Sequence, residues 1–438
     1  MKKVRIVTFC SALCNYGQVL QAYALQRFLR NRYKDYDIKL IYAHPFGATP
    51  QSEPPKKSPL KVFLAHFKTA RRYFNAYILC IDKYDKRVKR DKMETLKKAL
   101  REVLAEAGLD KNVANEARIK AFDKKREFER FKREHIALTS ESLQEFKGFT
   151  PEYDADCYIV GSDQVWNDWG AFQSGYTKAM DFYTLEFLPK NHKSRKISYA
   201  ASIGKPKFGS EFEKEYFKNA LSKFDAISLR ESCNIATLKE IGLQSVCVPD
   251  PSQLLTKSDY EKLIDSSIKN GEFDSRTSDG KIRKDSIFVY MLGNETSMDK
   301  NSVMAYLEAQ SGVIYTNANV DFSCKWDYKS DFAPTPQEWL ACVRDCKVLI
   351  TNSFHGCAFA LVMGTPFVAL KLGGGSSAMN TRFFQLLELF GLQNRLVDNL
   401  SDLETQIKTP IDFESINQKL DSWRNEGVEF LEQNLATL

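Results

Sequence analysis

The chain has 438 residues, of which 43% are hydrophobic and 27% are charged, a composition typical of globular proteins. Long low-complexity disorder and collagen-like structure are therefore excluded, and no run reaches the ~18 apolar residues that a membrane helix needs. At roughly 150 residues per domain, the length predicts two or three domains.

The first part of the chain repeats one unit, in which a short β-branched run is followed by a polar turn and a helical pattern. Strands are predicted over 3–9, 38–44, 157–163, 196–204, 225–231 and 245–255. Helices are predicted at about 18–32, 211–221 and 232–241. Strands that alternate with helices indicate βαβ units and a mostly parallel sheet.

A second series of the same kind begins after the polar stretch 269–285. Its strands are predicted over 286–294, 312–319, 347–353 and 365–371, and its helices over 336–346 and 354–364. We therefore predict an α/β fold of two Rossmann-like domains that face a cleft. The N-terminal α/β domain is expected over 1–270, a linker over 271–285, and the C-terminal α/β domain over 286–438.

Residues from about 55 to 150 break this rhythm, and we predict a helical, basic insertion there within the first domain. Residues 56–135 contain 24 Lys and Arg against 12 Asp and Glu, whereas the rest of the chain contains 39 against 44. Such a segment is either a solvated helical face or a peripheral contact for an anionic membrane. No nucleic-acid partner is predicted.

The ten cysteines include no CxxC pair and no neighbouring His cluster, so no metal site is predicted. Several lie in apolar runs, where a free thiol behaves as a small hydrophobe, which indicates a reducing compartment. The apolar start resembles a signal peptide only faintly, because Arg5 interrupts it and a first strand explains it better. We expect a cytoplasmic protein, with the inner face of the membrane as a candidate location for the basic segment.

Polar residues follow the predicted strands at their carboxyl ends, where ligands of such sheets bind. After the first strand, Asn15, Tyr16, Gly17 and Gln18 lead into a helix. Gly17 permits close approach of a ligand, and free N–H groups at a helix start suit an anion or a sugar. An ordinary helix entry is the alternative. Neither GxGxxG nor a P-loop is present, so a standard nucleotide fingerprint is not supported.

A second turn, Gly-Ser-Asp-Gln-Val-Trp-Asn, follows the run CYIV. Asp163 at the strand end is placed to bind a hydroxyl or accept its proton. Ser162, Gln164 and Trp166 are residue types that line sugar sites. The alternative is that Asp163 caps a turn and Trp166 packs in the core.

The strand ending at Leu229 is followed by Arg230, whose guanidinium can bind a carboxylate or phosphate through two hydrogen bonds. The alternative is an ordinary ion pair with Glu231. Asp250 and Pro251 follow the next strand, where turn geometry explains them.

His355 is one of only five histidines and lies where a strand turns into a helix. At a helix start a histidine can act as an acid or a base, although most single histidines are structural. The neighbours Asn352, Ser353 and Gly356 favour a site. Farther along, Lys371 and Arg382 flank the loop GGGSSAMNT and are candidate partners for a phosphate; that loop is either a phosphate cradle or a plain connection.

Five blocks occur in a familiar order: NYGQVLQAYAL, DCYIVGSDQVWN, ISLRES, VPDPSQLL and VLITNSFHGCAFALVMGTPFV. Together they resemble the polysaccharide pyruvyl transferase family, over roughly residues 4–372. The resemblance implies a fold similar to the two-domain GT-B glycosyltransferases. It also implies transfer of pyruvate from phosphoenolpyruvate (PEP) to a sugar of a surface polysaccharide or its lipid-linked precursor. The product is a ketal, phosphate is released, and PEP is a co-substrate with no further cofactor.

By the same resemblance, His355 is the catalytic acid/base and Arg230 helps to hold PEP. Some members carry a second Arg two residues before the catalytic His, where this chain has Ser353. Lys371 or Arg382 is the candidate replacement. We further assign Asp163 to an acceptor hydroxyl and the turn Asn15–Gln18 to the acceptor or the phosphate.

Two other functions are compatible with this fold. The first is a nucleotide-sugar glycosyltransferase of the GT-B type. Retaining members of that type usually carry a Glu in the helix before the Gly-x-Pro turn, where it binds the ribose hydroxyls. The corresponding helix here, CAFALVM, carries no acidic residue. The second is a non-catalytic scaffold of polysaccharide assembly, in which the basic segment 56–135 is the working surface.

Overall fold

The computed structural model describes residues 1–11, 14–45, 111–167, 178–268, 285–319, 324–436 and 438. Most of the predicted basic segment 56–135 and the linker 271–285 lie outside these residues. The chain divides into two compact units: Met1–Gly47 with Lys125–Leu438, and Ala48–Lys124. The predicted insertion runs to about residue 150, whereas in the structure the smaller unit ends at Lys124. Most of helix α4 (Lys111–Arg126) belongs to that unit.

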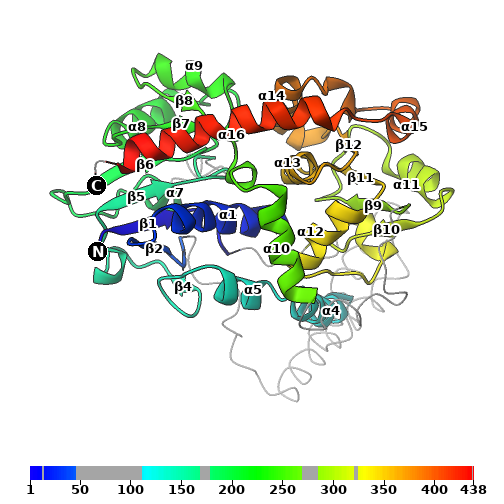
Figure 1. Ribbon diagram of the computed structural model, residues 1–438, viewed down its shortest axis with the longest axis horizontal. Coiled ribbons are helices and arrows are strands. Elements are labelled where there is room, and N and C mark those ends of the chain that lie inside the picture. The colour runs from blue at the N-terminus through cyan, green and yellow to red at the C-terminus, as the bar shows by residue number, and fades with distance from the viewer. Residues whose placement is uncertain (12–13, 46–110, 168–177, 269–284, 320–323, 437) are drawn as a thin grey trace, which may run out of the picture. The chain divides into compact units, whose positions relative to one another are not determined.

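The first sheet of the large unit contains four parallel strands in the order β2-β1-β5-β6 (Figure 1). These are β1 (Lys3–Val7), β2 (Asp37–Leu40), β5 (Cys157–Val160) and β6 (Arg195–Ser198). Beside it lie two short parallel pairs, β3 (Ala43–His44) with β4 (Gln144–Glu145) and β7 (Ser228–Leu229) with β8 (Val246–Cys247). Single bridges join Ile197 to Ala226 and Ala201 to Leu229, so the β7–β8 pair continues the sheet edge at β6.

The second sheet contains five parallel strands in the order β10-β9-β11-β12-β13. Their bounds are Val313–Tyr315, Ile287–Tyr290, Val348–Thr351, Phe367–Leu370 and Leu396–Val397. All residues of β9, β11 and β12 are buried, as expected for strands covered on both faces. Two parallel α/β sheets confirm the predicted fold class of two Rossmann-like domains.

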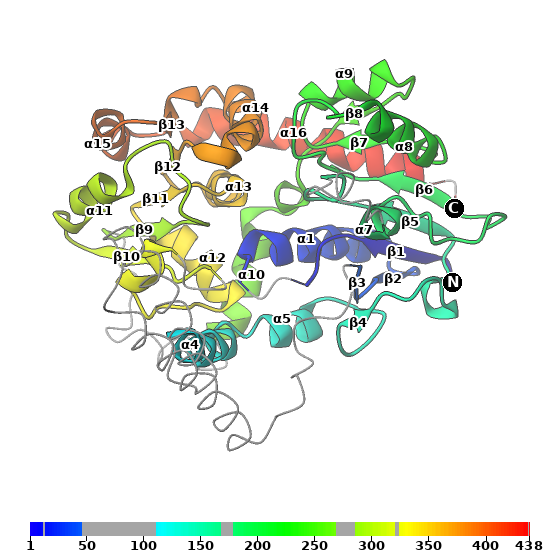
Figure 2. The same cartoon turned by 180° about the vertical axis from the view of Figure 1, so that it is seen from behind.

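Helices cover both sheets (Figures 1 and 2). Those of the first half, besides α4, are α1 (Tyr16–Arg32), α5 (Phe128–His135), α7 (Lys178–Tyr183), α8 (Glu211–Leu221), α9 (Cys233–Glu240) and α10 (Lys257–Ile268). Those of the second half are α11 (Lys300–Glu308), α12 (Pro336–Asp345), α13 (Phe354–Met363), α14 (Thr381–Phe390), α15 (Leu400–Lys408) and α16 (Phe413–Leu435). None of the helices in the described ranges is long and apolar enough to span a membrane.

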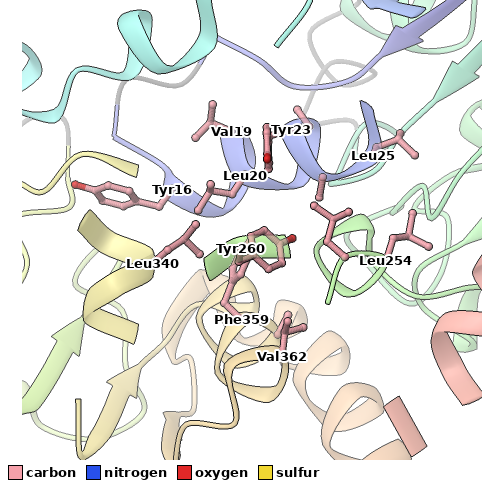
Figure 3. Packing of buried hydrophobic residues seen from close by; sticks show 14 of the residues in the cluster. Tyr16, Val19, Leu20, Tyr23, Leu25, Leu254, Tyr260, Leu340, Phe359 and Val362 are labelled. Carbon is pink, nitrogen blue, oxygen red and sulfur yellow. The ribbon is translucent and has the colours of Figure 1, made fainter. Parts of the chain in front are cut away.

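A buried apolar cluster joins helices of the two halves. Figure 3 shows Tyr16 and Leu20 of α1 on the side of Leu340 of α12 and Phe359 of α13. The Tyr23 ring packs instead on Phe131 of α5. The Tyr16 ring stacks on Trp339 with 5.4 Å between the centroids, and its hydroxyl donates a hydrogen bond of 2.6 Å to the carbonyl of Pro334. The amino end of α1 is therefore held firmly against the second half.

Helix α16 runs back from the second half to the first sheet (Figure 1). The Nη2 of Arg195 in β6 donates to Oδ1 of Asn434 at 2.8 Å, and Nε of Arg424 donates to the carbonyl of Gln253 at 2.8 Å. Gly427 lies so close to Pro249 that an added Cβ would stand 2.8 Å from its ring. The range 286–438 for the C-terminal domain stays a prediction. The last helix of that range packs on residues of the first half.

Candidate active site

Four chain segments bring one polar residue each to one place: three of these residues are predicted site residues, and the fourth, Asp250, is not. Asp163 follows β5, Arg230 follows β7, Asp250 follows β8, and His355 lies in the first turn of α13. The side chains of all four are at least 90% buried. The three strands are parallel, so their carboxyl ends open toward the same edge, and α13 reaches that edge from the second half.

Asp250 is the centre of this group. Its Oδ2 accepts hydrogen bonds from Oγ of Ser162 at 2.9 Å and from Nη1 of Arg230 at 3.1 Å, and it lies 3.5 Å from Nε2 of His355. Its Oδ1 accepts from the backbone N–H and the hydroxyl of Ser252 at 3.0 and 2.7 Å. One carboxylate thus holds the guanidinium by a hydrogen bond and lies within ion-pair distance of the imidazole, whose Nε2 has no hydrogen-bond partner among the described residues.

The charges in this group support one another despite their burial. Burial alone would raise the pKa of Asp250, but the positive charges of His355 and Arg230 and the N–H of Ser252 hold it well below its ordinary value. Burial would likewise lower the pKa of Arg230, but Glu231, Asp250 and Asp163 raise it above the ordinary value. Asp250 and Arg230 are therefore both ionised at neutral pH.

Arg230 is held on several sides and keeps one nitrogen free. Its Nε donates to Oε1 of Glu231 at 3.0 Å, and its Nη1 lies 3.7 Å from Oδ1 of Asp163. The guanidinium stands 4.4 Å above the ring centroid of Phe354. Its Nη2 is buried and has no hydrogen-bond partner among the described residues. A buried donor without a partner is costly, which makes this nitrogen a candidate contact for a ligand.

A cavity of about 240 Å³ opens beside Arg230, with Glu231, Asp250 and Arg382 in its wall. Within the described part of the chain, Nε of Arg382 and Oε2 of Glu231 are also buried without a partner. Burial, together with the nearby charge of Arg230, lowers the pKa of Arg382 to about 10, so this guanidinium stays protonated at neutral pH. Two arginines with free N–H groups at one cavity are a candidate site for an anion with more than one charge.

The predicted turn before α1 supports His355. The side chain of Asn15 caps the helix by accepting from the N–H of Gln18 at 3.2 Å. Gly17 lies against the imidazole: a Cβ there would stand 2.3 Å from Cβ and Cγ of His355 and 2.5 Å from its Nδ1. Only glycine leaves room for the ring at this distance. Tyr16, packed on Trp339, keeps the turn in place.

Replacing Gly17 by alanine is therefore expected to displace His355 and to lower turnover at least tenfold, while the protein remains folded. The reason is that a misplaced catalytic group costs much of the rate even when the fold is intact. Steady-state turnover with circular dichroism as a folding control would measure this. An alanine variant with normal turnover would show that the ring position does not matter. Gly375→Ala is a matched control, because no atom lies within 4 Å of the added Cβ and the backbone there is not left-handed.

Several residues predicted from the GSDQVWN turn have structural contacts. Ser162 holds Asp250, and Asp163 lies beside Arg230. Gln164 reaches the sulfur of Met379 at 3.7 Å, across to the loop after β12. Trp166 is fully buried, and its indole N–H donates to the carbonyl of Tyr183 at 3.1 Å. Trp166 therefore lies in the core, where it has no surface for a ligand.

The neighbours of His355 shape the start of α13. Asn352 exchanges two hydrogen bonds of 2.7 Å with the backbone of Leu292, and the hydroxyl of Ser353 caps the helix at the N–H of Gly356. A Cβ at Gly356 would stand 2.7 Å from Oγ1 of Thr351, so the helix packs tightly on the end of β11. These residues fix the imidazole and do not line the cavity.

The two candidate basic residues differ clearly. Nζ of Lys371 lies 3.3 Å from Oδ2 of Asp398, its side chain is 37% exposed, and it is absent from the cavity wall. Arg382 lines the cavity together with Arg230. The structure thus brings Arg382, and not Lys371, to the predicted site of the anion.

The sequence predicts turn geometry for Asp250, and an ordinary ion pair of Glu231 with Arg230 is only the alternative to an anion-binding Arg230. Asp250 does cap the turn through Oδ1, but its other oxygen joins Arg230 and His355. Glu231 does pair with Arg230, but its Oε2 faces the cavity side without a partner among the described residues. The signal that was available is their position: each follows a strand end, as the predicted site residues do.

Comparison with known proteins shows the family of the chain. The family model described as polysaccharide pyruvyl transferase matches residues 15–372. The chain belongs to the polysaccharide pyruvyl transferase family. The match includes Arg230, Asp250 and His355, whereas Arg382 and helices α14 and α16 lie beyond it. No curated protein is similar enough to be given as a relative.

Among solved structures, this member of the pyruvyl transferase family is similar to a UDP-GlcNAc 2-epimerase from Neisseria meningitidis bound to UDP-GlcNAc. That likeness has a TM-score of 0.44 and 9% identity and covers 99% of this chain and 100% of the other. It is also similar to the MnaA protein of S. aureus in complex with UDP, with a TM-score of 0.42, 10% identity and coverage of 100% and 98%.

Proposed function

We propose that the protein transfers pyruvate from PEP to two hydroxyl groups of one sugar in a surface polysaccharide or its precursor. One observation carries the proposal: as far as the described residues extend, Arg230 and Arg382 each have a buried, unpartnered N–H and line one cavity. Asp250 is also in its wall, and His355, which does not line it, lies 3.5 Å behind that carboxylate. PEP carries a carboxylate and a phosphate, so two guanidinium groups match its two anionic ends. Family membership supports a transferase of this kind.

The reaction requires one proton donor and a dry, charged pocket. A proton is added to the methylene carbon of PEP, positive charge develops at C2, and the first sugar hydroxyl forms a bond to C2. The C2–O bond to phosphate then breaks, and the second hydroxyl closes the ketal ring. Of the two hydroxyl protons, one ends on the new methyl group and the other on the departing phosphate.

His355 is proposed as the acid that protonates the methylene carbon. Asp250 orients it, because Nε2 lies 3.5 Å from Oδ2; such contacts shorten when substrate binds. Arg230 holds one end of PEP, and Arg382 takes the place of the second arginine that Ser353 does not supply. Asp163, whose carboxylate lies beside Arg230 but outside the cavity wall, is the proposed partner of the acceptor hydroxyl. The carboxylates in the wall itself are those of Glu231 and Asp250.

A lipid-linked acceptor belongs to the same proposal, as does contact between the basic segment 56–135 and the anionic inner face of the membrane. Such a contact would bring a cytoplasmic enzyme to its acceptor, and it would weaken as salt rises.

PEP is expected to raise the melting temperature of the wild-type protein, whereas UDP-glucose and GDP-mannose are not, since a ligand stabilises only the state that binds it. In Arg382→Met, the PEP concentration that gives half of the maximal rise in melting temperature is expected to increase roughly 10–100-fold, because a charged hydrogen bond is lost. Lys371→Met is expected to have the smaller effect. A thermal-shift titration of each variant measures this.

Arg344→Met is the matched control, because Arg344 pairs with Asp345 on the surface of α12. Stabilisation by nucleotide sugars and not by PEP would overturn the proposed function in favour of a glycosyltransferase. An Arg382→Met variant with wild-type PEP affinity would overturn only the assignment of Arg382.

A further inference from the structure

The cavity beside Arg230 has two chemically different sides. Arg230, Glu231, Asp250 and Arg382 form a charged side. The remaining wall carries no charge, and much of it comes from two helices of the second half: α14 with Gln385, Leu386 and Leu389, and α16 with Trp423. Figure 2 shows α14 beside α16. A donor such as PEP needs only the charged side, so the other wall is available to a second ligand.

The uncharged wall offers both a free donor and a free acceptor. Gln253 is 1% exposed, lines the cavity, and its Nε2 has no hydrogen-bond partner in the described ranges. On α14, Oε1 of Gln385 is buried and equally lacks a partner there. A hydroxyl group both donates and accepts hydrogen bonds, so a ligand with several hydroxyls satisfies the two amides together.

The same wall also offers apolar surface. The Trp423 indole is partly exposed at the cavity, next to Leu386 and to Leu389, which is 40% exposed. A pyranose ring has a face of C–H groups that packs on an indole, while its hydroxyls point outward to polar partners. An apolar surface beside free amide groups is the combination that such a ring requires.

We propose that Trp423, Gln385 and Gln253 form the acceptor subsite, and that it takes a neutral hexopyranose. This inference rests on the proposed function, since it makes the charged side the donor site. The neutrality follows from the wall: both arginines are engaged by the donor, and the nearest remaining charges, Glu231 and Asp250, repel an acidic sugar. Trp423 and Gln385 lie beyond the segment that the family model matches, so acceptor choice depends on a part of this chain outside that match.

The test measures binding of methyl glucoside, methyl galactoside and methyl mannoside to the full-length protein. Saturation-transfer NMR detects this binding with and without PEP. At least one neutral hexoside is expected to bind, and methyl glucuronide to bind more weakly. Trp423→Ala is expected to weaken binding about tenfold through loss of the apolar contact, and Trp423→Phe to restore most of it. Gln385→Ala should weaken binding too, while PEP affinity stays within about twofold in every variant.

Phe384→Ala is the matched control, because Phe384 is 46% exposed on the same helix and does not line the cavity. The inference is overturned if no neutral hexoside binds, if the glucuronide binds best, or if Trp423→Ala leaves hexoside binding unchanged. Failure of the wild-type protein to bind PEP, with hexoside binding that still depends on Trp423, would contradict the proposed donor and leave the sugar subsite supported.

Discussion

Replacing His355 by glutamine is expected to lower phosphate release from PEP by about 10²–10⁴-fold, the usual contribution of one acid/base group. Glutamine preserves the polar volume beside Gly17 and Asp250 but cannot donate a proton in this way. PEP binding should remain near the wild-type level, because Arg230 and Arg382 are untouched. The measurement is phosphate release with the methyl hexosides as acceptors, together with a PEP thermal-shift titration.

His192→Gln is the matched control. His192 also pairs with a carboxylate, at 2.9 Å from Oδ1 of Asp154, but it lies near the opposite end of β5, before β6 begins. Its replacement should leave phosphate release unchanged. If the His355 variant turned over PEP like the wild type, the proton would have to come from another group, and the proposed assignment of the acid would be wrong.

The second large effect is expected on stability. Asp250→Ala removes the carboxylate that holds Arg230 and His355, and leaves a buried guanidinium with less compensation. Breaking a buried pair in this way typically costs 3–5 kcal/mol. Urea unfolding should therefore show a free energy of unfolding lower by about that amount. Asp250→Asn should lose less, because the amide keeps the volume and can still accept from Ser252.

The loss on Asp250→Asn should also depend on pH. The pKa of Asp250 is held well below its ordinary value in the folded state, whereas in the unfolded chain it is ~3.9. Its contribution to stability is therefore complete above about pH 5 and fades as the pH falls below the unfolded value. The difference between wild type and variant should shrink on acidification. A difference that grows toward low pH would contradict the proposed charge pairing.

The strands were predictable because a parallel sheet requires nearly continuous apolar runs, such as Val348–Thr351 and Phe367–Leu370. The meeting of Arg230, Asp163 and His355 was expected from their positions at strand ends. Asp250 was assigned a turn role because Asp-Pro after a strand is typical of turns. The same two residues occur whether or not the second carboxylate oxygen also contacts a charged group. Its partners come from distant segments, so local pattern does not distinguish the two cases.

The positions of two tryptophans depend on packing that no local sequence pattern reveals. Trp166 follows a polar turn, yet the Tyr183 carbonyl and the rings around it draw the indole into the core. Trp423 shows the reverse, since it lies in a long amphipathic helix and only the return of α16 to the first half places it at the cavity. The periodicity of a helix predicts which side is apolar, but not what that side will meet.

The contact between Gly17 and His355 makes the position of the proposed acid depend on both halves of the chain. The second half supplies the imidazole, and the first half supplies the flat backbone surface and the carboxylate of Asp250 against which it rests. Neither half expressed alone would hold the imidazole of His355 in this position. A hybrid in which one half is exchanged for that of a distant homologue would have to preserve the contacts of the imidazole with Gly17 and Asp250. Without them, we expect the hybrid to bind the anionic donor but not to turn it over.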